Sequence, residues 1–192
     1  MATIIKGTTL RTWSGGYVDL LDPQPADIRI VDIAHSLANL CRFGGHIDEF
    51  YSVAEHSIHC ARVADEVFGY DCETQLQCLL HDAAEAYLGD VCRPLKQYLG
   101  EAYRALERKF EQVIGESLDC EIGTRIDRVR HIDNALLFAE RRHLMMRDGV
   151  KWHGETEAIY LSTVYPICYE PDTAAMIFLS LYETLQTRRA NR

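Results

Sequence analysis

The chain has 192 residues, 47% of them hydrophobic and 26% charged, a balance typical of a folded globular protein. Its net charge of −9 argues against a surface that neutralises nucleic-acid phosphates, although a local site can still hold a small anion. The N-terminus lacks the apolar core of a signal peptide and no apolar run is long enough to span a membrane, so we expect a cytoplasmic protein. Seven scattered cysteines without a CxxC pair predict reduced, buried thiols.

Residues 8–31 are the least helical part of the chain. Segments rich in β-forming residues flank Gly15 and Gly16, and this pattern predicts a short hairpin. Trp13 and Tyr17 lie on either side of the expected turn. They could stack a nucleotide base, and a core position is the alternative for Trp13.

Helical spacing of apolar residues covers most of the chain beyond the expected hairpin. Asp32 is the expected N-cap of the first helix, which the Phe43-Gly44-Gly45 stretch would end. Ser52 and Glu55 form a capping box that predicts the start of the second. Asp71 would cap the third.

The third helix is expected to continue through the segment LLHDAAEAYLGD, residues 79–90. Pro94 suits the first turn of another helix, and Gly115 and Gly123 are expected to end helical stretches. The later helices are predicted at about 101–114, 124–146 and 171–188, with an irregular segment at 148–170. We therefore predict one all-α domain over 1–192, with a hairpin at about 8–31, site-bearing helices at about 32–146 and a C-terminal helix.

Acidic residues and histidines interrupt these apolar patterns. His81 and Asp82 are neighbours whose side chains can converge on one point, and such donors suit Zn²⁺, Mn²⁺, Fe²⁺ or Co²⁺. A capped polar pair is the alternative. Asp133 and Glu140 share a face of the 124–146 helix with apolar residues, and a buried carboxylate must be paired or bound to a metal. A salt bridge to an arginine is the competing interpretation.

The order of these residues along the chain is informative. His56 lies on the second helix, His81 and Asp82 follow, and Asp133 lies on a later helix. This order, together with NLCRFGGHIDEFYSVAEHS (39–57) and LLHDAAEAYLGDVCRPLK (79–96), resembles the HD-domain metal-dependent phosphohydrolases. The likeness covers roughly residues 10–145. It is strongest to the small bacterial and phage nucleotidases related to the YfdR and YfbR proteins, and the HD-GYP signature of a larger branch is absent.

The resemblance implies a role for each matching residue. It assigns His56, His81, Asp82 and Asp133 as ligands of one divalent Co, Mn, Zn or Fe ion, and allows a second Mg or Mn ion to arrive with the substrate. It implies that Arg42 contacts phosphate. Within the implied acidic pair, Glu85 would orient water or shuttle protons, and Asp90 would assist at the leaving 5′-oxygen or hold the sugar.

Other polar residues are weaker candidates. His46 follows Arg42 closely enough to reach the same phosphate, whereas His59 is better explained by a packing or surface position. His131 is a minor rival to Asp133 as a ligand, two positions away and on a different helical face. A substrate with several phosphates would need further basic residues. The candidates for these contacts are Lys6, Arg11, Lys96 and Arg141 or Arg142.

The resemblance implies a hydrolase that cleaves the 5′-phosphate ester of deoxynucleoside monophosphates. A deoxynucleoside triphosphate triphosphohydrolase, including the dATP-depleting kind found in phages, is the alternative, because both enzymes break the bond between the α-phosphorus and O5′. A non-catalytic nucleotide-binding module is the second alternative. We expect a small deoxynucleotide as partner, no nucleic-acid polymer, no membrane, and a homo-oligomer.

Overall fold

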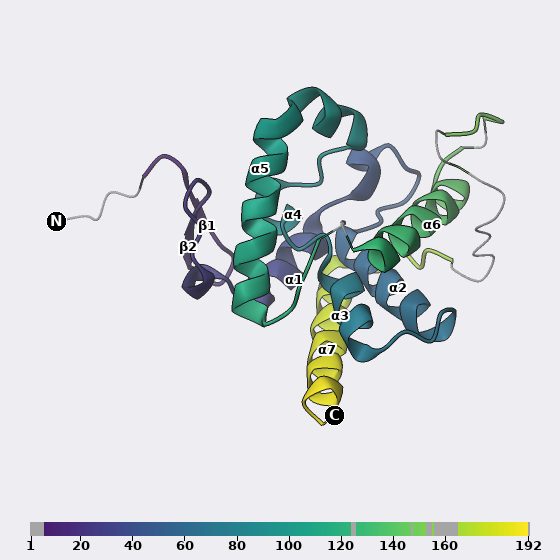
Figure 1. The fold of residues 1–192 in the computed structure, drawn as a ribbon. Coiled ribbons are helices and arrows are strands. Elements are labelled where there is room, and N and C mark those ends of the chain that lie inside the picture. The colour runs from purple at the N-terminus through teal and green to yellow at the C-terminus, as the bar shows by residue number, and fades with distance from the viewer. Residues whose placement is uncertain (1–5, 124–125, 147, 153–154, 156–164, 192) are drawn as a thin grey trace.

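A computed structural model describes residues 6–123, 126–146, 148–152, 155 and 165–191 of the chain. It is mostly helical, with a short antiparallel hairpin near the N-terminus, which confirms the predicted fold class (Figure 1). In the hairpin, β1 (Thr9–Arg11) pairs with β2 (Tyr17–Asp19), and Leu10 lies opposite Val18. The helices are α1 (Ile30–Asn39), α2 (Val53–Glu66), α3 (Cys72–Leu80), α4 (Glu85–Leu88), α5 (Arg93–Leu118), α6 (Asp127–Leu144) and α7 (Pro171–Ala190).

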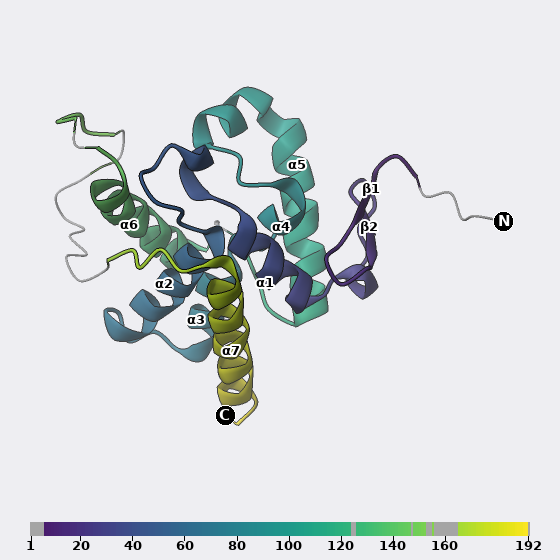
Figure 2. The same ribbon diagram turned by 180° about the vertical axis from the view of Figure 1, so that it is seen from behind.

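The core forms where α7 packs against α1, α2 and α3, while α6 packs against α2 and α3. Figure 2 shows α7 running alongside α3 and the hairpin at the opposite edge of the molecule from α6. Leu37, Ile58, Leu79, Leu136 and Phe178 come from five different helices and are fully buried. Burying each such side chain contributes about 1.5–3 kcal/mol, so this packing fixes α2, α3 and α6 relative to one another. Among the described residues, none of the helices is both long enough and apolar enough to cross a membrane.

Several predicted helix boundaries differ from those in the structure: the first helix ends at Asn39, before Phe43, and α5 ends at Leu118, before Gly123. For three other predictions a specific contact or turn explains the difference. Helix α1 begins at Ile30 with Arg29 as its N-cap, and Asp32 lies inside the helix. The Asp32 carboxylate instead accepts hydrogen bonds from the backbone N–H and the hydroxyl of Ser14, at 2.6 and 2.8 Å. Asp32 therefore attaches the hairpin turn to α1 and does not start the helix.

The segment 79–90 is not one helix. Helix α3 ends at Leu80, residues 81–84 form turns, and the short α4 ends at Gly89, whose φ of 80° favours glycine. Gly115 does not end a helix either, since it lies within α5. A side chain at Gly115 would come within 2.7 Å of the Cys120 carbonyl oxygen, so glycine is needed there for close packing.

The capping box at the start of α2 is only half formed. The Ser52 hydroxyl accepts the backbone N–H of Glu55 at 3.1 Å, as predicted. The buried Glu55 carboxylate, however, accepts three backbone N–H groups from the chain leading into α7: Ile167 at 2.7 Å, Cys168 at 3.0 Å and Tyr169 at 2.7 Å. Glu55 thus ties the C-terminal segment to the helix that carries His56. The irregular segment predicted at 148–170 lies partly outside the described residues, and its described parts contain neither helix nor strand.

Candidate metal centre

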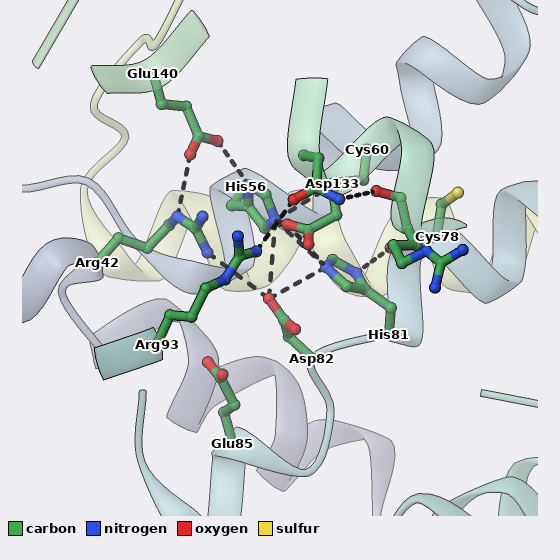
Figure 3. A network of polar contacts seen from close by, with 12 residues as sticks. Arg42, His56, Cys60, Cys78, His81, Asp82, Glu85, Arg93, Asp133 and Glu140 are labelled. Carbon is green, nitrogen blue, oxygen red and sulfur yellow. Dashed lines mark hydrogen bonds and ion pairs between the residues drawn. The ribbon is translucent and has the colours of Figure 1, made fainter. Parts of the chain in front are cut away.

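Four side chains from three parts of the chain converge on one point (Figure 3). His56 comes from the first turns of α2, His81 and Asp82 from the turns after α3, and Asp133 from α6. The break between α3 and α4 places His81 and Asp82 at the end of α3, in the turns that lead into α4. The four predicted ligands therefore lie together, although the segment that carries two of them is not helical as expected.

The distances among their donor atoms are short and similar. The Nε2 atoms of His56 and His81 lie 3.3 Å apart. Asp133 Oδ1 is 3.2 Å from His56 Nε2 and 3.9 Å from His81 Nε2, while Asp82 Oδ2 is 3.2 Å from His81 Nε2 and 3.8 Å from His56 Nε2. Ligand atoms about 2.1 Å from a shared ion in tetrahedral geometry are about 3.4 Å apart. The spacing fits one cation of that size.

Hydrogen bonds on the far side of each ring orient the two histidines. His56 Nδ1 lies 2.6 Å from Glu140 Oε1, and His81 Nδ1 lies 2.8 Å from the Cys78 carbonyl oxygen. Both partners accept hydrogen bonds, which assigns the proton of each ring to Nδ1. The lone pair of each Nε2 is then directed toward the other three side chains. This arrangement is typical of histidines that bind metals.

Glu140 is fully buried and holds several groups of the centre in place. Besides His56, its carboxylate accepts Arg42 Nε at 3.2 Å and the Tyr51 hydroxyl at 2.8 Å. Burial alone would raise the pKa of Glu140, but Arg42, His56 and Tyr51 together keep it below the usual value. The buried carboxylate expected on this helix is therefore paired, and it positions both a histidine and an arginine.

Arg42 is buried beside the cluster, with Nη1 3.7 Å from Asp82 Oδ2. It lies in a short 3-10 turn, Arg42–Gly45, in which Phe43 and Gly44 adopt positive φ angles of 57° and 62°. This turn directs the arginine toward the centre. Arg42 therefore supplies a fixed positive charge next to the group of ligands, as its predicted role requires.

Cys60, which the sequence analysis treats only as one of the reduced, buried thiols, is indeed a free, buried cysteine, and its thiol also lies in the centre. Cys60 Sγ is 3.5 Å from His56 Nε2, and His56, Cys60 and His81 form a buried group that could bind a metal, with donor atoms within 4.8 Å of one another. The spacing of four residues between His56 and Cys60 on one helix could have revealed it. Burial raises the pKa of the Cys60 thiol well above its usual value, which disfavours the thiolate and leaves the carboxylates as the better-suited charged ligands.

Glu85 and Asp90 follow Asp82 in the chain, and their carboxyl groups interact with it electrostatically. Burial and the neighbouring charges of Asp82 and Asp90 raise the pKa of Glu85 well above its usual value. Its Oε2 is buried without a hydrogen-bond partner among the described residues. Burial also raises the pKa of Asp90, with a contribution from Asp82 and an opposing one from Arg42. A raised pKa makes each of these carboxylates a stronger base than usual, which suits a role in proton transfer.

Lys96 was expected to contact the substrate, and the structure places it in an ion-pair network. Its Nζ lies 3.1 Å from Glu85 Oε1 and 2.8 Å from Glu107 Oε1. Burial lowers the pKa of Lys96, yet these two carboxylates raise it overall. The lysine therefore lies at the edge of the site as a partner of Glu85.

The hairpin residues proposed to stack a base lie elsewhere. Trp13 is 65% exposed, and its ring stacks on His35 of α1 with centroids 4.5 Å apart. Tyr17 and Arg11 belong to the same exposed hairpin. In both ribbon views this hairpin lies on the far side of α1 and α5 from α6. The structure does not bring these side chains to the metal centre, and the core position considered for Trp13 is wrong.

Most basic residues considered for outer phosphates are already paired. Lys6 Nζ lies 2.9 Å from Asp19 in the hairpin. Arg141 Nη1 is 2.8 Å from Glu155, and Arg142 Nη1 is 3.8 Å from the same carboxylate. These contacts leave few of the predicted cations to hold additional phosphates.

The remaining histidines have separate surroundings. His46 is exposed at the end of the Arg42–Gly45 turn. His59 Nε2 lies 3.4 Å from Glu55 Oε1, and the exposed His131 contacts the Phe68 ring edge-on. His59 thus occupies the packing position expected for it.

Comparison with known proteins places the chain in a family. It is 39% identical over 147 residues to the uncharacterized protein YfdR of Escherichia coli (strain K12), covering 74% of this chain and 76% of YfdR. The chain belongs to the YfdR family. It is also 41% identical over 117 residues to the uncharacterized protein RCAP_rcc00048 of Rhodobacter capsulatus, covering 57% of this chain and 58% of that protein. No protein-family model matches the chain.

Proposed function

We propose that the protein is a metal-dependent phosphohydrolase of the HD type, acting on the 5′-phosphate ester of deoxynucleoside monophosphates. The observation that carries the proposal is the convergence of His56, His81, Asp82 and Asp133 with both histidine Nε2 atoms directed inward. Two imidazoles and two carboxylates suit a divalent Mn, Fe, Co or Zn ion. Such an ion, when bound, supplies a Lewis acid that polarises a phosphoryl oxygen and acidifies water.

Residues of the chain itself would bind the phosphate and transfer the protons. Arg42, held by Glu140, offers a guanidinium group to the phosphate without having to be ordered first. Glu85 has a free carboxylate oxygen and a raised pKa, which suit a base that takes a proton from the attacking water. The bond between phosphorus and O5′ then breaks. Asp90, whose pKa is also raised, would give its proton to the departing O5′.

The monophosphate is favoured over the triphosphate by the state of the surrounding cations. Lys96 is paired with Glu85 and Glu107, Arg141 with Glu155, and Lys6 with a hairpin aspartate remote from the centre. A triphosphate substrate would need at least some of these to hold its β- and γ-phosphates. The triphosphohydrolase remains the alternative, because the same bond is broken.

The test is a substrate panel on metal-defined protein. Purified protein is stripped with a chelator, reloaded separately with Mn²⁺, Co²⁺, Zn²⁺ or Fe²⁺, and incubated with the four deoxynucleoside monophosphates and triphosphates. Chromatography identifies the products. Nucleoside plus phosphate supports the proposal, nucleoside plus triphosphate supports the alternative, and binding without turnover for every metal would identify a non-catalytic module.

A further inference from the structure

Arg93 is a basic residue near the centre that the sequence analysis did not consider. It is the first residue of α5, and it follows Asp90 closely in the chain. Its Nη2 donates a hydrogen bond to Asn134 Oδ1 at 3.1 Å, and Asn134 directly follows the proposed ligand Asp133 on α6. Figure 3 shows the side chain pointing toward the metal centre, as that of Arg42 does from another element.

The charge on Arg93 differs from that on the other cations around the site. Arg42 is paired with Glu140 and Asp82, and Lys96 with two glutamates. Within the described part of the chain, by contrast, no carboxylate lies within ion-pair distance of Arg93, and its amide partner Asn134 is neutral. Its positive charge is therefore uncompensated at a site rich in acidic groups.

An incoming phosphate needs such a charge. Asp82, Asp133 and Glu140 carry three negative charges, which Arg42 and a divalent ion would together offset. Glu85 and Asp90 add further acidic groups beside them. A phosphate dianion would then meet little net attraction unless another cation faced it from the solvent side. A guanidinium with free donors suits this role, because it can bind two phosphate oxygens at once.

We infer that Arg93 is a second phosphate-binding residue, an exposed arginine that contacts the substrate phosphate beside the buried Arg42. This inference rests on the proposed function, since it assumes that a phosphate group is bound at the metal centre. In the free protein, Asn134 accepts the hydrogen bond that a phosphate oxygen would take over. Exchanging a neutral amide for a phosphate oxygen strengthens the bond, because charge-assisted hydrogen bonds are roughly twice as strong as neutral ones.

The alternative role for Arg93 is purely structural, as a tether between α5 and α6. Asn134→Ala separates the two roles, because it removes the tether and leaves the arginine free to bind phosphate. Arg93→Lys keeps the charge but loses the planar fork, and Arg93→Gln removes the charge and keeps part of the hydrogen bonding.

The experiment measures the binding of inorganic phosphate and of deoxyadenosine monophosphate to the Mn²⁺-loaded protein by calorimetry, in the Glu85→Gln background so that turnover is suppressed. Arg93→Gln should weaken binding about tenfold, with Arg93→Lys in between and Asn134→Ala close to its parent. The loss in Arg93→Gln should shrink as salt is raised, because the arginine is exposed. Steady-state kinetics in the wild-type background should show the change in KM more than in kcat.

Equal phosphate affinity of Arg93→Gln and its parent would overturn the inference. An equal loss of affinity in Asn134→Ala and Arg93→Gln would also overturn it, because Arg93 would then act only as a tether. Binding is measured without turnover, so a failure of this inference can be told apart from a failure of the proposed hydrolysis. If the wild-type protein bound phosphate through Arg93 but hydrolysed no nucleotide, the result would support the role of Arg93 and contradict the proposed hydrolase activity. If the protein hydrolysed nucleotides equally well with Arg93→Gln, the result would support the proposed hydrolase activity and show that Arg93 does not bind the phosphate.

Discussion

The candidate metal centre and the N-terminal hairpin each depend on a buried carboxylate, and the two carboxylates are satisfied in different ways. Glu140 faces His56, Arg42 and Tyr51 in the interior, so it is part of a network that includes charged partners. Asp32 accepts a hydroxyl and a backbone N–H of Ser14. A buried ion pair fixes geometry and is costly to break, whereas neutral donors attach one element to another at smaller cost. The difference predicts where substitutions matter.

The largest effect is expected at the ligands themselves. His81→Ala should abolish metal binding and hydrolysis, because the ring nitrogen that faces the other ligands is lost while the apolar core is untouched. Elemental analysis measures the metal, and circular dichroism checks the helical content. Cys60→Ser is the matched control and should retain the metal. Full metal occupancy in His81→Ala would refute the ligand assignment.

Glu85→Gln should lower kcat by about a hundred- to ten-thousand-fold, since it removes proton transfer while keeping the size of the side chain. Metal content should remain at the wild-type level, because Glu85 lies outside the group of four ligands. Single-turnover rates and elemental analysis test the two statements separately. Metal loss in this variant would make Glu85 a ligand, and an unchanged kcat would remove it from the mechanism.

Glu140→Ala should lower the free energy of unfolding by about 3–5 kcal/mol, because Arg42 and His56 would be left buried without their partner. Asp32→Ala, which leaves only neutral donors unpaired near the surface, should cost about 1–3 kcal/mol. Urea denaturation of the metal-free proteins measures both values. Equal costs would contradict the contrast drawn between the two regions.

Lys96→Met should shift the acid limb of the kcat profile to higher pH. Lys96 lowers the pKa of Glu85, so its removal raises that pKa further and leaves less of the base ionised at a given pH. The pH dependence of kcat, recorded with saturating substrate, tests this directly. Glu107→Gln is the control: it keeps Lys96 in place and should move the limb less. A pH profile identical to that of the wild type would show that Lys96 does not influence the function of Glu85.

The smallest effect is expected in the hairpin. Trp13→Ala removes an exposed ring that stacks on His35, and it should change the free energy of unfolding by about 0.5 kcal/mol or less. The kcat/KM for nucleotide should not change, because the hairpin lies away from the centre. A marked loss of kcat/KM with normal stability would restore Trp13 as a base-stacking residue.

Local sequence patterns were sufficient to predict much of the fold. The period of the apolar residues predicted the helices, and Gly15 and Gly16 predicted the hairpin, because these signals depend on neighbours in the sequence. Boundaries failed where a distant contact decided them. Asp32 is a good N-cap by type, yet Ser14 uses its carboxylate, and Gly115 is required by Cys120.

The candidate site shows the same division. The four ligands could be predicted because their order along the chain carries a family resemblance. The structure brings their side chains together. The partner of Glu140 could not be chosen from many arginines, since the choice depends on how α6 packs near the Arg42 turn. Arg93 was missed for a similar reason: nothing in its neighbourhood along the chain indicates Asn134, which lies 41 positions later.

The carboxylate of Glu55 has a consequence for how the molecule opens. The amide protons of Ile167, Cys168 and Tyr169 can exchange with solvent only when this segment separates from α2. The next residue after Glu55 is His56, so whatever holds the start of α2 in place also protects those three amides. A ligand that binds only the intact centre slows every opening that would disturb it. The hydrogen-exchange rate of a segment more than a hundred residues away in sequence thus reports on the integrity of the metal centre.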